Sequence, residues 1–162
     1  MSLRAEASDH VWATSGTRSA HEKLLDYVEA YFSASARDPA ARLQMTQKAP
    51  IYLQEPGHSR TIVGLELLAD GRRNLLTFDP SFEPPSSIRQ LLVKSKGSKS
   101  VKVAADQGTL SKAMRTYRRT EAQLARHLVY ETLTYGRVAP NKDSKAEGEE
   151  SKAMKSFIRI VQ

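Results

Sequence analysis

Apolar side chains recur with helical spacing between residues 19 and 32. One stripe of an α-helix, at i, i+1, i+4, i+7 and i+8, would carry Leu24, Leu25, Val28, Tyr31 and Phe32. Ser19 and Glu22 stand ahead of this stripe, three residues apart, and fit a capping box at the helix start. An Asp-Pro pair at 38–39 ends the pattern. The segment therefore predicts an amphipathic helix that needs a sheet or another helix to cover its apolar face.

Residues 50–82 instead show patterns typical of strands. A short strand is predicted up to Leu53, with Ile51 and Leu53 on one face and Tyr52 on the other. After a break at 55–57, the run 59–68 is so continuously apolar that we expect both of its faces to be covered, as in a central strand. Asp70 and Gly71 supply a turn, and residues 74–78 supply the returning strand. The pattern predicts an antiparallel hairpin.

The rest of the chain alternates between weaker patterns and polar stretches. We expect a short helix from Ser86 or Ser87, a surface loop at 94–108, a helix at 111–128 and a last strand at 129–135. Residues 1–18 are expected to form a flexible N-terminal segment, 19–135 the folded unit, and 136–162 a polar tail whose closing run 157–161 has no clear partner. The fold class predicted is α+β, with a central, mostly antiparallel sheet and flanking helices.

Length and composition indicate a single water-soluble domain. The chain has 162 residues, of which 40% are apolar and 27% are charged. No apolar run approaches the roughly 18 residues that cross a bilayer, and the first residues lack the apolar core of a secretory signal. We therefore expect an intracellular location, cytoplasmic or nuclear, and no membrane partner. The sequence contains no cysteine, which excludes disulfides, thiolate metal sites and a cysteine nucleophile within this chain.

Two residues with catalytic chemistry flank the predicted hairpin. His58 precedes its first long strand and Asp79 follows its second. A histidine oriented by a carboxylate is the general-base half of a nucleophilic triad. Counting from the predicted turn, Asp79 pairs with about Ile62. His58 then lies a few residues further out at the same end of the hairpin. A β-bulge could close this offset. In the alternative interpretation, His58 hydrogen-bonds within a turn and Asp79 merely ends a strand.

Other candidate residues carry weaker signals. Ser59 is a poor substitute nucleophile, because adjacent residues of a strand point to opposite faces. His10, His21 and His127 lack the spacing of a metal site, so we predict no metal and no cofactor. The net charge of +7 favours acidic partners or nucleic acid. A solvated helix face, or a recognition surface for phosphate or an acidic protein, would be formed by Arg115, Arg118, Arg119 and Arg126.

Three short motifs resemble a known family. They are Tyr-Leu-Gln at 52–54, Gly-His-Ser-Arg-Thr-Ile-Val-Gly at 57–64 and Phe-Asp-Pro at 78–80. Together they resemble the ubiquitin-fold-modifier-specific cysteine protease family, and most of all its zinc-finger-containing deubiquitinase branch. The resemblance runs from the helix that begins near His21, through the hairpin, to the strand after residues 117–119. The long motif at 57–64 is the specific signal, since the helices alone would not identify the family.

The resemblance implies a fold and a chemistry. The family fold is papain-like, and a thiolate attacks the peptide or isopeptide bond after the C-terminal glycine of the modifier. The residues that match the catalytic base and its orienting acid are His58 and Asp79. The implied partners are conjugates of ubiquitin or of a ubiquitin-like modifier.

The sequence departs from the family pattern in two ways. The family carries its nucleophilic cysteine and an oxyanion contributor in the N-terminal half of the domain, whereas this chain begins after that region and has no cysteine. Glu55 and Pro56 also replace a polar pair before Gly57. We therefore expect an incomplete papain-like peptidase, its C-terminal half, as a truncated product or a degenerate paralogue that is inactive alone. The alternatives are a non-catalytic pseudoprotease that binds a ubiquitin-like modifier, and a basic adaptor for nucleic acid.

Overall fold

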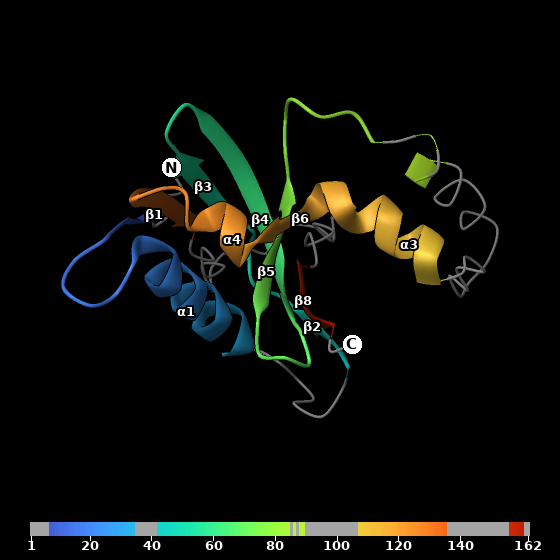
Figure 1. Ribbon diagram of the computed structural model, residues 1–162, viewed down its shortest axis with the longest axis horizontal. Helices are drawn as coiled ribbons and strands as arrows, with labels where there is room; N and C mark the ends of the chain where they lie inside the picture. The colour runs from blue at the N-terminus through green and yellow to red at the C-terminus, as the bar shows by residue number, and fades with distance from the viewer. Residues whose placement is uncertain are drawn as a thin grey trace, which may run out of the picture.

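The central layer of the protein is an antiparallel β-sheet. The computed structural model describes residues 7–34, 42–84, 86, 88–89, 107–135 and 156–160. Six strands follow the order β1-β7-β3-β4-β5-β6 (Figure 1). They are β1 (Ala7–Ala13), β3 (Ile51–Glu55), β4 (His58–Leu67), β5 (Arg73–Phe78), β6 (Arg118–Thr120) and β7 (Val129–Tyr135). All of their pairings are antiparallel, so the predicted α+β class with a central antiparallel sheet is confirmed.

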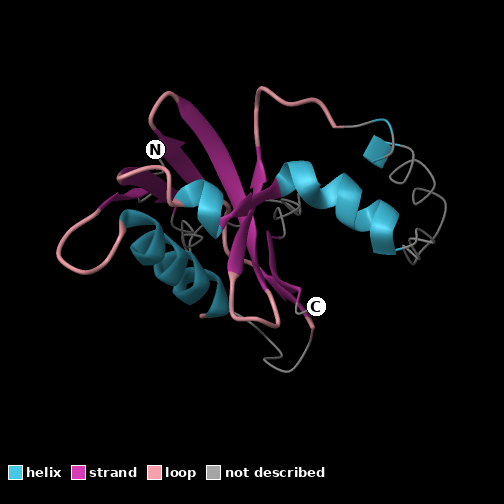
Figure 2. Ribbon diagram, viewed as in Figure 1, coloured by secondary structure: helices cyan, strands magenta, loops and turns pink. Residues whose placement is uncertain are grey.

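Helix α1 (Ala20–Ser33) lies beside this sheet, as Figure 2 shows, and packs on β1, β4 and β7. The predicted capping box is present: the Ser19 amide and hydroxyl both donate to the Glu22 carboxylate, at 2.8 and 2.7 Å. The apolar stripe enters the core as predicted, except that Tyr31 is only partly buried. The fully buried core is made up of Ala20, Leu24, Leu25, Val28, Phe32, Ile51, Leu53, Ile62, Leu65, Leu75, Leu124 and Tyr130. Helix burial on one face of the sheet therefore holds the fold together.

The β4–β5 hairpin contains an irregularity that determines which residues face the helix. Leu65 pairs with Leu75, but Ile62 pairs with Thr77, so Val63 is an extra residue in the ladder. Because side chains alternate along a strand, this bulge allows both Ile62 and Leu65 to enter the core on the α1 face, although they are three residues apart. The turn at 70–71 is present as predicted, with Gly71 at a φ of 84° that glycine adopts without strain.

Several predicted elements are wrong. Instead of a flexible segment, residues 7–13 form β1, which pairs along its whole length with β7. The closing apolar run contains β8 (Ser156–Ile160), which pairs with β2 (Leu43–Thr46) in a separate two-stranded sheet. Both strands have partners distant in the sequence, which local periodicity does not reveal.

The predicted helix at 111–128 is also wrong in part. The structure has α3 (Gln107–Met114), a 3-10 turn (Arg115–Tyr117), strand β6 and then a short α4 (Glu121–Leu124). Thr120 caps α4 by accepting a hydrogen bond from the Gln123 amide at 3.3 Å. A strand replaces the helix at this point because Arg118 and Arg119 point to opposite faces of the sheet. Each forms an ion pair there with an acidic side chain, described below. The final strand, in contrast, is β7, with the predicted bounds.

Some predictions fall outside the described residues. These are the Asp-Pro pair at 38–39 and the loop at 94–108 as far as residue 106, since residues 107 and 108 open α3. Of the short helix after Ser86 or Ser87, residues 86, 88 and 89 are described, and all three are helical.

Candidate functional site: a histidine, two carboxylates and two arginines

The structure brings His58 and Asp79 into direct contact. His58 is the first residue of β4, and Asp79 follows the last residue of β5. The Nε2 atom of His58 lies 2.8 Å from Oδ2 of Asp79. The imidazole is 31% exposed and the carboxylate 22%, so a reacting group has access to the pair. The catalytic role of the two residues remains a prediction.

The bulge at Val63 explains why these two side chains meet. The predicted register, which paired Asp79 with about Ile62, is wrong: Phe78 pairs with Thr61, so Asp79 comes opposite Arg60. Arg60 and His58 are two residues apart and share a face, and Asp79 joins them there. Without the bulge, the register of Leu65 with Leu75 would place Asp79 opposite Thr61, on the other face. By absorbing Val63, the bulge thus keeps the acid and the base on one face.

The turn before β4 places His58 next to a second acid. Pro56 and Gly57 connect β3 to β4, with Gly57 at a φ of 77°. The turn pairs Glu55 directly with His58 across the two strands. Their side chains therefore point to the same face of the sheet.

Three groups hold the Asp79 carboxylate. The Ser81 amide donates to Oδ1 at 2.9 Å, His58 lies at Oδ2, and the Nε atom of Arg60 lies 3.3 Å from the same Oδ2. Burial alone would raise the pKa of Asp79, but the Ser81 amide, His58 and Arg60 together lower it below its usual range. Asp79 is therefore an ionised acceptor at neutral pH, suited to orient an imidazole and to stabilise its cation.

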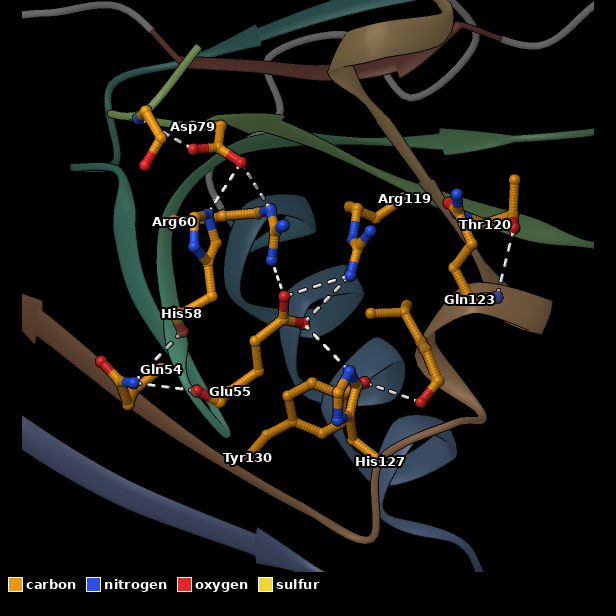
Figure 3. A network of polar contacts seen from close by, with 12 residues as sticks. Gln54, Glu55, His58, Arg60, Asp79, Arg119, Thr120, Gln123, His127 and Tyr130 are labelled. Atoms are coloured by element: carbon orange, nitrogen blue, oxygen red, sulfur yellow. Dashed lines mark hydrogen bonds and ion pairs between the residues drawn. The ribbon is translucent and has the colours of Figure 1, made fainter.

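A buried ion-pair network extends from this site along the α1 face of the sheet (Figure 3). Glu55 is only 3% exposed and pairs with Arg60 on one side. On the other side, Nη2 of Arg119 lies 3.1 and 3.2 Å from its two carboxylate oxygens. The Nε2 atom of His127 is 3.8 Å from Glu55, and the ring of His127 lies edge-on to Tyr130. The network thus connects Asp79 to the core.

Sequence reasoning missed the roles of Glu55, Arg60 and Arg119. A signal was present at Glu55, which follows Ile51 and Leu53 at every second position and so falls on the inward face of β3. A carboxylate at such a position requires a cationic partner. The sequence did not show that two arginines, from β4 and β6, would supply it.

Ser59 and His10 make no contact within this network. Ser59 lies on the other face, as predicted, where it lines a hollow with Tyr52, Thr61 and Phe78; Arg60 and Asp79 also line this hollow. The His10 ring packs edge-on against Trp12 and Tyr27. Within the part of the chain that the structure describes, no cluster of three histidine or acidic side chains could hold a metal ion. None of the helices described is long and apolar enough to cross a membrane.

The arginine surface proposed for nucleic acid is not a single helix face. Arg118 and Arg119 are engaged by Glu66 and Glu55, whereas Arg115 and Arg126 are exposed. Two of the four guanidiniums are therefore already paired with buried carboxylates.

Comparison with known proteins supports the resemblance seen in the motifs. Residues 3–133 match peptidase family C78. Zinc finger-containing ubiquitin peptidase 1 of Bos taurus is 40% identical over 81 residues, which cover 50% of this chain and 14% of that protein. The proteins of the same name from Macaca fascicularis and Mus musculus are 31% and 32% identical over 126 residues, which cover 68% of this chain and 22% of each relative. The match spans about a fifth or less of the length of these relatives, and the chain belongs to peptidase family C78.

Proposed function

We propose that this chain provides the acid–base part of a papain-like, thiol-dependent isopeptidase site for ubiquitin or a ubiquitin-like modifier. The observation that carries the proposal is the 2.8 Å contact between His58 Nε2 and Asp79 Oδ2, where β4 begins and β5 ends. Membership of peptidase family C78 and the names of the relatives support this choice of chemistry and substrate.

The contact with Asp79 supports a different role for each nitrogen of His58. Asp79 engages Nε2, so Nδ1 is the nitrogen that can exchange a proton with a nucleophile. In the proposed reaction, His58 takes the proton of a cysteine thiol supplied from outside these 162 residues, and the thiolate adds to the carbonyl carbon of the modifier's last glycine. The C–N bond then breaks, and the imidazolium gives the proton to the leaving amine. A water molecule, deprotonated by His58, then hydrolyses the thioester, which releases the modifier and restores the thiol. Asp79 keeps the ring oriented and stabilises its cation throughout.

These 162 residues contain no cysteine. We therefore expect no thiol-dependent turnover from them on their own, because the members of a catalytic triad act as a unit. The test is to incubate the purified chain with a fluorogenic C-terminal derivative of ubiquitin, alongside His58→Ala. Equal, background-level signals are expected. Robust hydrolysis that His58→Ala abolishes would contradict this expectation of inactivity.

A second candidate function is modifier binding without catalysis. Aromatic side chains are exposed beside the candidate site: Phe78 is 53% exposed, Tyr52 42% and Phe82 40%. Exposed aromatic groups of this kind are typical of protein-binding surfaces. Titrating labelled ubiquitin into the chain separates the two functions, since a binding module keeps its affinity in His58→Ala and loses it in Phe78→Ala. If no binding is detected, a role in modifier recognition by this chain alone is excluded.

A further inference from the structure

We propose that Arg60 is a positioning residue for the candidate site: its guanidinium, anchored by the buried Glu55, holds the Asp79 carboxylate in line with His58. The inference rests on the proposed function of the His58–Asp79 pair, and it gives a role to Arg60, to which the motif at 57–64 assigned none. Figure 3 shows Arg60 between the two carboxylates.

The contacts place Arg60 between a buried and a partly exposed acid. Its Nη1 atom pairs with Oε1 of Glu55, and its Nε atom lies 3.3 Å from Oδ2 of Asp79. That same oxygen receives His58 Nε2 at 2.8 Å. The Arg60 side chain is only 13% exposed, so water competes weakly for these contacts. A planar guanidinium with donors in fixed directions can orient two carboxylates at once, which an ammonium group does less well.

The anchor of Arg60 is itself fixed. Arg119 reaches both oxygens of Glu55 from β6, and Glu55 extends inward from β3. The position of Arg60 is therefore determined by three strands, β3, β4 and β6, of the same sheet. A change at Asp79 would not release it.

Charge balance explains why Asp79 completes the network. Glu55 supplies one negative charge against two guanidiniums, which leaves one surplus positive charge among buried groups. Asp79 is the carboxylate that faces this surplus, through Arg60. Burial and the like charge of Arg119 lower the pKa of Arg60, and Asp79 opposes that effect. The charged and titratable groups facing the network are His58, Tyr130 and His127, in addition to the four ions named above.

A purely structural role for Arg60 makes a different prediction. If the guanidinium only joined β3 to β4, its removal would lower stability but leave the protonation of Asp79 unchanged. If it positions Asp79, its removal raises the pKa of that carboxyl and weakens the contact with His58 as well. Arg118 supplies a matched control, because it makes a similar pair with buried Glu66 on the opposite face of the sheet.

The experiment follows the full chain by NMR, with the Asp79 side-chain carbon and the His58 ring nitrogens observed across a pH titration. In Arg60→Gln we expect the Asp79 midpoint to rise by about one pH unit, a tenfold gain in proton affinity. We also expect the nitrogen signals of His58 to lose the asymmetry that Asp79 imposes. Arg60→Lys should recover the midpoint only in part, since it keeps the charge but not the planar fork. Arg118→Gln, observed at a temperature where it remains folded, should leave both signals as in the unmodified chain.

Two results would overturn the proposal. One is an Asp79 midpoint in Arg60→Gln equal to that of the unmodified chain. The other is an equal shift in Arg118→Gln, which would indicate a general loss of structure. Should Arg60→Gln fail to fold, Arg60→Lys decides, because an unshifted midpoint and unchanged His58 signals would then count against the proposal. Ubiquitin turnover and binding are not used, so the proposed function can fail while this inference stands, and the reverse.

Discussion

Two buried glutamates, one on each face of the central sheet, show how similar ion pairs take on different roles. On the face away from α1, the Glu66 carboxylate accepts from Nε and Nη2 of Arg118, both at 2.7 Å, and from the Asn74 side chain at 2.8 Å. On the α1 face, Glu55 is shared by Arg60 and Arg119. The Glu66 group consists of Glu66, Arg118 and Asn74, whereas the Glu55 group continues through Arg60 to Asp79 and His58.

The difference lies in where each network ends. Glu66 satisfies its bonding capacity locally, so its pair joins β4, β5 and β6, and Arg118 adds a hydrogen bond of 3.2 Å to the Ser111 carbonyl of α3. The Glu55 network ends at a partly exposed histidine, the base of the proposed site. A buried ion pair by itself is weak evidence of function, but one that leads to a partly exposed acid–base pair supports the proposed site.

The largest expected effect on stability comes from breaking the ion pair between Glu66 and Arg118. Arg118→Gln leaves the fully buried Glu66 without a cationic partner, and we expect a loss of about 3–5 kcal/mol in the free energy of unfolding. Arg119→Gln should cost roughly half as much, because Glu55 keeps Arg60. Urea denaturation of both variants measures the difference. Equal losses would show that Glu55 does not share its charge as the structure indicates.

A smaller effect on stability is expected when the pH is lowered. Burial would raise the pKa of Glu66, but Arg118 and Asn74 outweigh it and hold the pKa below 4.5. The unfolded state therefore binds protons first as the pH falls. This stabilisation is complete above pH 4.5 and is lost as the pH drops through the folded pKa.

Glu66→Gln removes this contribution, so the urea midpoint of the variant should fall less steeply between about pH 5 and pH 3. Asp79 acts in the same direction, with its pKa lowered from 3.8. Asp79→Asn should therefore give a smaller change in slope, as its side chain is more exposed. Identical slopes in Glu66→Gln and the unmodified chain would show that Arg118 does not stabilise the ionised form of Glu66.

The smallest effect on stability is predicted for removal of the bulge at Val63. Deleting Val63 would leave a regular ladder with the observed pairs, Ile62 with Thr77 and Gly64 with Leu76. His58 and Asp79 should thus stay in contact, with a stability change within about 1 kcal/mol. The NMR signals of the His58 ring report the contact directly. Its loss on deletion would mean that the twist of the bulge, rather than the register it sets, brings the pair together.

Much of the fold could be predicted because its signals are local. The capping box and apolar stripe identified α1, alternation identified β3 and β7, and the Asp70-Gly71 turn identified the β4–β5 hairpin. Strands β1, β2, β6 and β8 were missed, because each gains its stability from a partner distant in the chain.

For the site, the sequence by itself determined the chemical types: a histidine before one strand, a carboxylate after its neighbour, and no cysteine. Tertiary structure alone decided that the two side chains meet, because the ladder absorbs Val63 in a bulge and so keeps Asp79 on the same face as His58. It also decided that Glu55, Arg60 and Arg119 converge from three strands. The sequence specifies the type of each side chain directly. The face on which a side chain lies, and its neighbours, depend on pairing between segments far apart in the sequence.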